Sequence, residues 1–190
     1  MKDPTKTPQI TILGVGNILL KDEGVGVRVI EHLDARYSFS ENVQIVDGGV
    51  LGMRLMGIIG STDVLIVVDA VCNRGAPGTL YRLADEQVPR RVLAKQSMHQ
   101  LDLPEVLALS AAIDKNPQVV VVGVEPEDIT TMDVELTPTI AAKVGEMVAM
   151  VLAELDALGV PYTAKPLVTS PRHPVRLSVW LNLVLHEMRG

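Results

Sequence analysis

Four residues whose side chains bind metals or transfer protons stand where apolar segments of this sequence end. Glu23 lies in the loop after the first apolar segment. Asp47 and Asp69 end the next two, and His99 comes just before a segment of helical period. Carboxylate and imidazole groups together suit a borderline divalent ion such as Ni²⁺, Zn²⁺ or Mn²⁺. Because three protein ligands leave positions open for water or substrate, Glu23, Asp69 and His99 predict a working metal site rather than a structural one.

Each of these residues also has an ordinary structural explanation. A carboxylate at position 22 or 23 can accept amide hydrogen bonds at a helix N-terminus, and Asp22 is the better candidate for that cap. Asp47 precedes two glycines and suits a turn, Asp69 can cap the turn after its strand, and a lone histidine such as His99 is more often hydrogen-bonded than a ligand. The argument for a site therefore depends on their convergence.

The spacing of apolar residues predicts the elements that must hold these side chains. Short apolar runs predict buried strands, and apolar residues at helical spacing predict helices. The expected strands are residues 9–15, 43–47, 64–69, 78–83 and 118–123, and the expected helices are residues 24–37, 51–60, 100–114 and 138–159. No helix fits between residues 69 and 78, so residues 78–83 should form a hairpin-like or edge strand.

This alternation predicts an α/β fold, a three-layer sandwich in which a mostly parallel, twisted sheet of about five strands has helices on both faces. Ligands of such sheets bind in the crevice beyond the carboxyl ends of the strands. The same ends carry the four polar residues, which the fold would therefore bring together.

The chain divides into one α/β domain over residues 1–162 and a tail over residues 163–190. Residues 163–174 hold three prolines and indicate an irregular connector. Apolar residues at helical spacing then predict a C-terminal amphipathic helix between residues 177 and 188. We expect this helix to pack on its own domain, with docking to a partner or a membrane surface as the alternatives.

Composition limits the class of partner and the compartment. Seventeen basic and twenty-three acidic residues give a net charge of −6, which argues against nucleic acid. No run of 18 apolar residues and no secretory signal are present, so neither a membrane span nor export is expected. The single cysteine, Cys72, is best explained as a small apolar filler, and one cysteine favours a reducing, cytoplasmic location.

The glycines after the first strand raise a nucleotide-binding alternative. Gly14-Val15-Gly16 is similar to the start of a dinucleotide-binding loop, and Asp47 ends the next strand as a ribose-binding acid does. The third glycine of that pattern falls at position 19, which is Leu19. Bulky residues there would keep a pyrophosphate from the helix N-terminus, so this alternative is the weaker one.

Residues 14–26, GVGNILLKDEGVG, resemble the signature of the hydrogenase maturation endopeptidases, which process the large-subunit precursor of nickel–iron hydrogenases. The resemblance covers about residues 9–159, and further motifs follow in the family's order: Asp47-Gly48-Gly49, Asp69-Ala70, Ala76-Pro77-Gly78-Thr79, Ser97-Met98-His99-Gln100-Leu101, Val122-Gly123-Val124-Glu125-Pro126 and Leu136-Thr137-Pro138-Thr139.

The resemblance implies an endopeptidase that removes a C-terminal peptide from the precursor once nickel has been inserted. It implies that Glu23, Asp69 and His99 recognise this nickel, which the substrate supplies, so that the isolated chain holds no tightly bound metal. We expect Asp47 to orient the peptide or act as a general base, next to a substrate-binding Gly48-Gly49. The remaining alternatives are a nickel chaperone or a nucleotide-binding module, and nothing requires more than a monomer.

Overall fold

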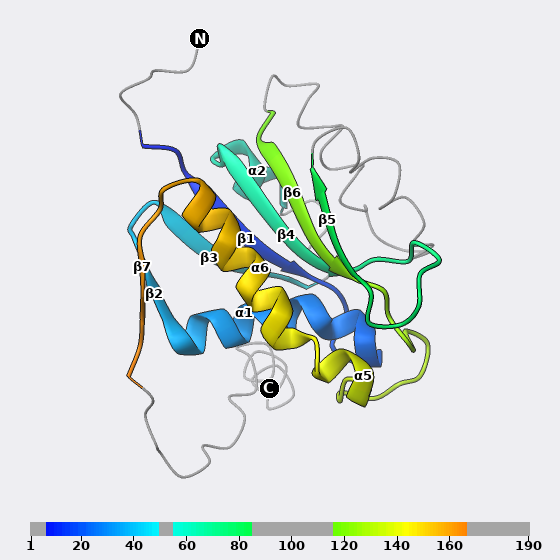
Figure 1. Ribbon diagram of the computed structural model, residues 1–190. Helices are drawn as coiled ribbons and strands as arrows, with labels where there is room; N and C mark the ends of the chain where they lie inside the picture. Colours follow the sequence, from blue (N-terminus) through cyan, green and yellow to red (C-terminus); the bar gives the residue numbers. More distant parts are fainter. Residues whose placement is uncertain (1–6, 50–54, 85–115, 167–190) are drawn as a thin grey trace, which may run out of the picture.

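The computed structural model describes residues 7–49, 55–84 and 116–166. Its strands are β1 (Ile10–Val15), β2 (Tyr37–Phe39), β3 (Val43–Gly49), β4 (Val64–Ala70), β5 (Leu80–Ala84), β6 (Gln118–Val124) and β7 (Tyr162–Ala164). Its helices are the 3₁₀ helix η1 (Lys21–Gly24) and the α-helices α1 (Val25–Arg36), α2 (Leu55–Gly60), α5 (Pro138–Ala141) and α6 (Val144–Ala157). Figure 1 shows α6 crossing in front of the sheet.

The central sheet has the strand order β3-β1-β4-β6-β5. The first four strands are parallel, whereas β5 is antiparallel to β6 at one edge. The predicted mostly parallel sheet of about five strands is confirmed, as is the edge position of the strand expected at residues 78–83. A connection of nine residues after β4 is too short for a standard crossover, so β5 cannot be parallel to its neighbour.

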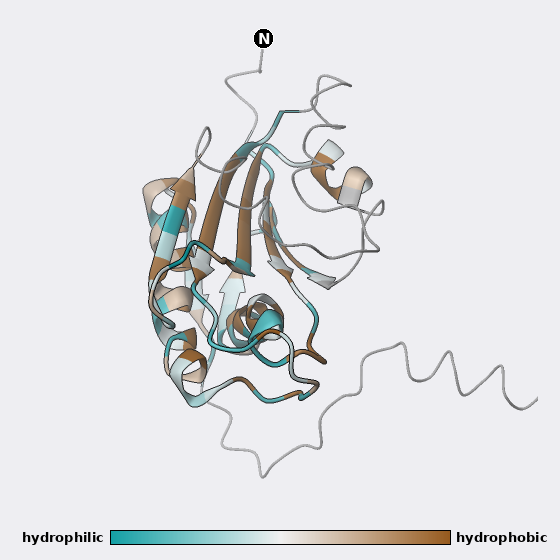
Figure 2. Ribbon diagram, turned by 90° about the vertical axis from the view of Figure 1, so that its right-hand side faces the viewer, coloured by the Kyte–Doolittle hydropathy of each residue, from teal (hydrophilic) through white to brown (hydrophobic). Residues whose placement is uncertain are grey.

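Two apolar cores lie on opposite faces of the sheet, as expected for helices on both sides. The first core joins Ile12 and Ile66 to residues of α1 and α6, including Val29 and Val151. The second joins neighbouring sheet residues such as Leu65 to Ile59 of α2. Figure 2 shows the middle strands as hydrophobic along most of their length, which is typical of strands buried on both faces.

The helix predicted over residues 138–159 is two helices, so the prediction of one continuous helix is wrong. Thr137 caps the first, its hydroxyl accepting from the Ile140 N–H at 3.4 Å, with Pro138 directly after it. The backbone N–H of Lys143 then donates to Ile140, three residues back, at 2.9 Å. This tightened bond ends α5 before α6 begins. The expected stop at Gly159 is present, with a φ of +68°.

A second, two-stranded sheet was not predicted. The strand β2 pairs with β7 in antiparallel register, and the rings of Tyr37, Phe39 and Tyr162 pack together there. The boundary expected after residue 162 falls inside β7. The expected helices at residues 100–114 and 177–188 lie outside the described residues. In the part of the chain that is described, no helix is long and apolar enough to cross a membrane.

Candidate active site

The loop after β1 is held against the sheet by glycines that leave no room for a side chain. A Cβ on Gly16 would lie 1.7 Å from the carbonyl oxygen of Glu23. A Cβ on Gly26 would lie 2.2 Å from the carbonyl oxygen of Val68 and 2.3 Å from that of Val15. The start of α1 therefore rests directly on the carboxyl ends of β1 and β4. The dinucleotide-binding alternative would need the space beside Gly16 for a phosphate group. The chain's own backbone fills that space.

Asp69 is a buried acid at the carboxyl end of β4, with 4% of its surface exposed. Its carboxylate accepts a hydrogen bond from the Ala70 N–H at 2.8 Å. Its register partner on β6 is Gly123, and a Cβ there would lie 2.5 Å from the side chain of Val71. Because side chains alternate along a strand, Asp69 is on the same sheet face as Leu65.

Glu23 reaches the same end of the sheet from a different element. It lies half-buried in η1, and η1 is in contact with β4. At Gly16, which follows β1, the backbone of Glu23 packs closely against the chain. At Gly26, the start of α1 packs against Val68, the residue before Asp69. Two of the three predicted metal ligands, far apart in sequence, are therefore at one end of neighbouring strands.

Asp47 ends up on the other side of the sheet. It is exposed on the edge strand β3, and its register partner on β1 is Gly14. Ile45, two residues earlier, packs into the core beneath α1 and α6, so strand alternation directs Asp47 to that face. Asp69 is directed to the opposite face. The structure thus places Asp47 at the predicted end of the sheet without bringing its side chain toward Asp69.

The glycines after Asp47 have a packing role in β3. A Cβ on Gly48 would lie 2.8 Å from Leu13 Cδ1 and 2.9 Å from the Gly14 carbonyl oxygen. Gly49 pairs with Val15 after an irregularity in the register between β1 and β3. Close packing within the sheet accounts for Gly48.

His99 lies outside the described residues, so its distance from Glu23 and Asp69 is not defined. Among residues 7–49, 55–84 and 116–166, no three His, Cys, Asp or Glu residues are grouped so as to hold a metal ion. The metal site predicted at Glu23, Asp69 and His99 therefore stays a prediction.

His32 does not belong to this end of the sheet. It is half-buried on α1, and partial burial together with the neighbouring Arg36 lowers the pKa of its imidazole. It stands seven residues after the start of the helix, about 10 Å along its axis.

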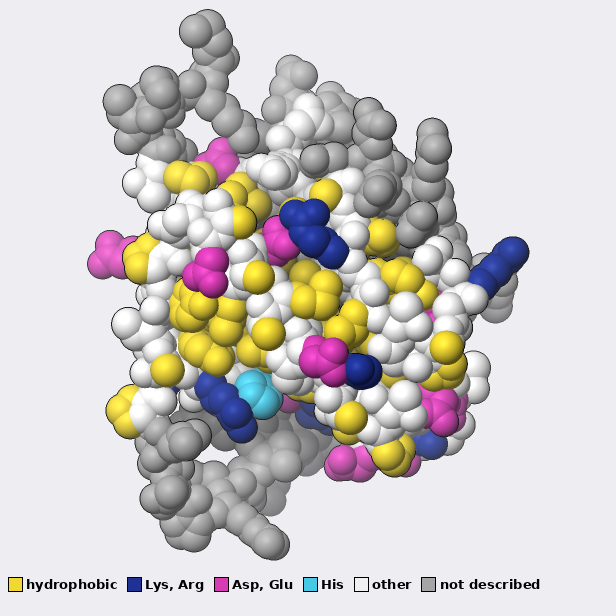
Figure 3. All heavy atoms as spheres, in the orientation of Figure 1, with side chains coloured by type: hydrophobic (Ala, Val, Ile, Leu, Met, Phe, Trp, Pro, Cys, Tyr) yellow, Lys and Arg dark blue, Asp and Glu magenta, His cyan; other side chains and the backbone are white. Residues whose placement is uncertain are grey.

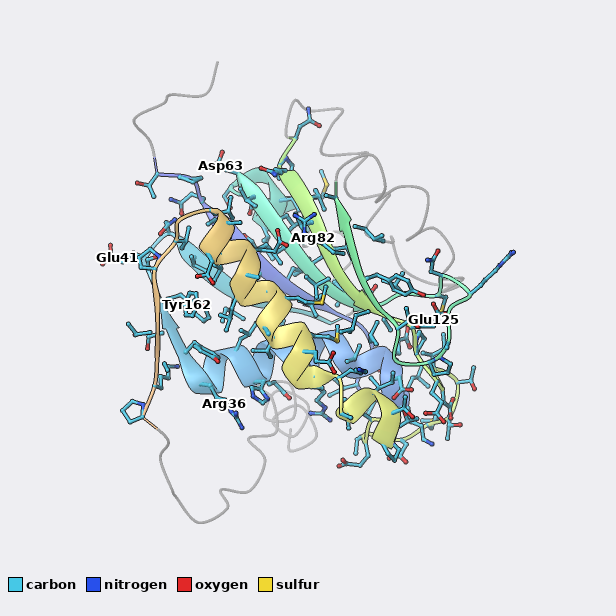
Figure 4. All side chains as sticks on the ribbon, in the orientation of Figure 1. Arg36, Glu41, Asp63, Arg82, Glu125 and Tyr162 are labelled. Atoms are coloured by element: carbon cyan, nitrogen blue, oxygen red, sulfur yellow. The ribbon has the colours of Figure 1, made fainter. Side chains whose placement is uncertain are left out.

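Glu125 organises the loop after Asp69, a role that was not predicted. Its buried carboxylate accepts hydrogen bonds from the Asn73 N–H at 2.8 Å, the Arg74 N–H at 3.1 Å and the Tyr81 hydroxyl at 2.7 Å. Burial raises the pKa of Glu125, but these hydrogen bonds outweigh it and lower the pKa overall. Figure 4 shows Glu125 just beyond β6, at the opposite end of the sheet from Asp63.

Asp22 does not cap its own helix, and that prediction is wrong. Neither η1 nor α1 has a side-chain cap. The fully buried carboxylate of Asp22 instead accepts from the backbone N–H groups of Glu127, Asp128 and Thr137, at 3.0, 2.9 and 2.7 Å, and from the Thr137 hydroxyl at 3.0 Å. It ties the loop after β1 to the loop that joins β6 to α5.

The sequence is similar to known proteins of one family. The model of one family, described as hydrogenase maturation protease, matches residues 27–154. The hydrogenase 2 maturation protease of Escherichia coli (strain K12) is 43% identical over 154 residues, which cover 80% of this chain and 93% of that protein. A hydrogenase expression/formation protein HupD of Bradyrhizobium diazoefficiens is 34% identical over 176 residues, covering 90% of this chain and 92% of that protein.

Solved structures show the same fold. The hydrogenase maturating endopeptidase HybD from E. coli matches with a TM-score of 0.78 and 42% identity, over 83% of this chain and 98% of that one. The [NiFe] hydrogenase maturation protease HycI from Thermococcus kodakarensis KOD1 matches with a TM-score of 0.64 over 80% of this chain and 95% of that one. At 22% identity, the second match supports the fold alone.

Proposed function

The chain belongs to the hydrogenase maturation protease family, a family of endopeptidases, and we propose that it reads nickel in its substrate through Glu23, Asp69 and His99. The substrate in this proposal is the large-subunit precursor of a nickel–iron hydrogenase, from which a C-terminal peptide is removed after nickel insertion. The metal therefore arrives with the substrate.

One observation carries the proposal: Glu23 and Asp69 are brought to one end of the sheet by glycine contacts that tolerate no side chain. Asp69 is buried, and its carboxylate accepts the Ala70 N–H. A nickel ion that already has ligands in the precursor needs only a few more. Two carboxylates and one imidazole are suitable ligands for it.

These contacts would position the scissile peptide in the crevice beyond β1 and β4. A divalent ion there polarises a carbonyl group or activates a bound water. The chain's own part is to orient the precursor, so that only a nickel-loaded precursor presents its C-terminal peptide correctly. Asp47 remains a candidate for orienting the peptide or for the general base, with Gly48 and Gly49 beside it, although strand alternation directs it away from Asp69.

The test is a mass-spectrometric assay of precursor cleavage with nickel-loaded and nickel-free precursor. We expect cleavage of the loaded form only, and a loss of at least about 100-fold in rate for Glu23→Gln, Asp69→Asn or His99→Ala. Asp47→Asn, assayed alongside, shows whether that carboxylate acts in the reaction. Cleavage of nickel-free precursor at the normal rate, or full activity of His99→Ala, would contradict the proposal that the chain recognises nickel in the precursor.

Because the substrate supplies part of the coordination, the isolated chain should bind nickel weakly. Equilibrium dialysis with Ni²⁺ distinguishes this from a nickel chaperone, which would retain the metal by itself. We also propose that the chain acts as a cytoplasmic monomer. A single cysteine fits a reducing compartment, and light scattering after size-exclusion chromatography measures the oligomeric state.

A further inference from the structure

Large apolar side chains are exposed at one place in the described part of the chain. Ile18 is 38% exposed, Leu19 51%, Met132 80% and Val134 48%, and no other large apolar side chain among the described residues is comparably exposed. All four come from two segments, the loop after β1 and the loop between β6 and α5. We call these four residues the apolar rim.

The two segments that carry the apolar rim are joined by backbone hydrogen bonds. The Lys21 N–H donates to the Asp133 carbonyl at 2.8 Å, and the Asp133 N–H donates to the Leu19 carbonyl at 3.0 Å. Leu20 and Asp133 thereby form an isolated parallel bridge. The backbone of residues 19–21 consequently lies beside Asp133, whose chain neighbours are Met132 and Val134, so two segments more than 110 positions apart meet here.

Further contacts fix this surface in place. The guanidinium of Arg28 on α1 donates to the Val134 carbonyl at 2.9 Å. Asp22, between the apolar rim and α1, accepts four hydrogen bonds from the second loop. Exposed apolar groups gain nothing from folding, whereas a contiguous set of them on a fixed frame is typical of a binding surface.

One segment of the apolar rim leads into the candidate site. Glu23 is four residues after Leu19 in the same segment, which crosses the end of β1. A precursor whose nickel reaches Glu23 therefore comes close to the segment that carries Ile18 and Leu19.

The surroundings of the apolar rim are acidic. Residues 17–24 and 126–137 together hold six acidic residues and one lysine. That lysine, Lys21, is paired with Asp128 at 3.5 Å, while Glu127, Asp133 and Glu135 are exposed. Figure 3 shows acidic and hydrophobic side chains side by side at the lower right, where Figure 1 places α5 and the loop before it. The complementary partner has apolar side chains and nearby basic residues.

We infer that the apolar rim docks an apolar segment of the hydrogenase large-subunit precursor that is flanked by lysine or arginine. This inference rests on the proposed function for the identity of the partner. Docking at the apolar rim adds affinity that does not depend on nickel, and the three predicted ligands then select the loaded precursor.

The test uses Leu19→Ser/Met132→Ser in the full chain, with Ala149→Ser/Ala153→Ser as the matched control on the exposed side of α6. Binding of recombinant precursor, nickel-free and nickel-loaded, is measured by biolayer interferometry, and cleavage is measured as KM and kcat. We expect the rim variant to raise Kd for both precursor forms and KM by about tenfold or more, with kcat unchanged. The control variant should match the wild type.

A second variant, Glu127→Lys/Glu135→Lys, tests the charge and replaces the first if that one fails to fold. It should weaken binding and reduce its dependence on salt concentration. Unchanged Kd in both variants would overturn the inference. So would a wild-type dimer that the rim variant dissociates while precursor binding persists, because the apolar rim would then join two copies. Failure of the proposed nickel recognition is distinguishable, since it would change only the difference in Kd and KM between nickel-loaded and nickel-free precursor.

Discussion

At the scale of one residue, the packing of Gly26 explains why a glycine stands at this position of the segment after β1. Helix α1 can rest on the carboxyl ends of β1 and β4 only because no side chain separates them. Gly14 and Gly16, which raised the weaker nucleotide-binding alternative, likewise leave no room for a side chain against the backbone of residues 23–26. They bring Glu23 to the end of the sheet that Asp69 occupies, as its place after the first strand predicted. The close backbone contacts that hold it there were not predictable from the sequence.

Gly26→Ala should therefore destabilise the fold strongly. Its Cβ would lie 2.2 and 2.3 Å from two carbonyl oxygens, and backbone atoms cannot move away cheaply. We expect a loss of about 3 kcal/mol or more in the free energy of unfolding, measured by urea denaturation. Gly145→Ala on α6 is the matched control, because no atom lies within 4 Å of its Cβ. That variant should gain up to about 1 kcal/mol from helix propensity, and equal effects of the two changes would contradict the packing argument.

At the scale of elements, Asp22 connects two loops that the sequence treats as independent. It stands at the right place for a helix cap, and residue type and position favoured that prediction. Its actual partners are 105–115 residues away. No local sequence pattern predicts such a contact, because it depends on how the loop between β6 and α5 folds over Asp22.

Asp22→Asn should loosen the loop between β6 and α5. The amide would present N–H donors to backbone N–H donors, which leaves buried groups unsatisfied and costs about 3 kcal/mol of stability. Amide hydrogen exchange of Glu127, Asp128 and Thr137 should accelerate more than that of the central strands. Asp133→Asn, an exposed acid in the same loop, is the control and should change stability by less than about 1 kcal/mol. Unchanged exchange in Asp22→Asn would argue against this anchor.

The elements themselves were predictable to different degrees. Strands β4 and β6 are almost wholly apolar, so their burial was evident, and the short connection before β5 indicated its edge position. The strands β2 and β7 are three residues each and pair across more than 120 residues, which leaves no local signal. The break between α5 and α6 depends on one tightened hydrogen bond at Lys143, in a segment whose composition favours helix throughout.

At the scale of the whole molecule, the loops at the carboxyl end of the sheet are fixed by carboxylates. Glu125 holds the loop after β4, and Asp128 accepts hydrogen bonds from the Thr130 and Thr131 N–H groups, both at 3.0 Å. Hydrogen bonds from Thr131 and Thr130 keep the pKa of Asp128 well below its usual range. The end that carries the candidate site therefore depends on ionised groups, whereas the rest of the sheet depends on apolar packing.

This arrangement predicts that acid weakens the fold through Glu125. Its pKa is lowered in the folded state, so the unfolded chain binds the proton more readily. The stabilisation is complete above the ordinary value of 4.5 and is lost as the pH falls through the lower folded value. Glu125→Gln should cost about 1.5–3 kcal/mol at pH 7, because buried donors lose a charged acceptor.

Urea denaturation of wild type and Glu125→Gln at several pH values from 7 to 3 tests this. The difference between their free energies of unfolding should narrow as the pH falls below about 4.5. The lowered pKa of His32 makes both proteins less stable already below its ordinary 6.5, and taking the difference removes that contribution. Glu146→Gln, an exposed acid paired with Lys143, should differ from wild type by less than about 1 kcal/mol at every pH. If the Glu125→Gln difference stayed constant down to pH 3, protonation of Glu125 would not be what weakens the loop, and the candidate site would tolerate acid as well as the apolar cores do.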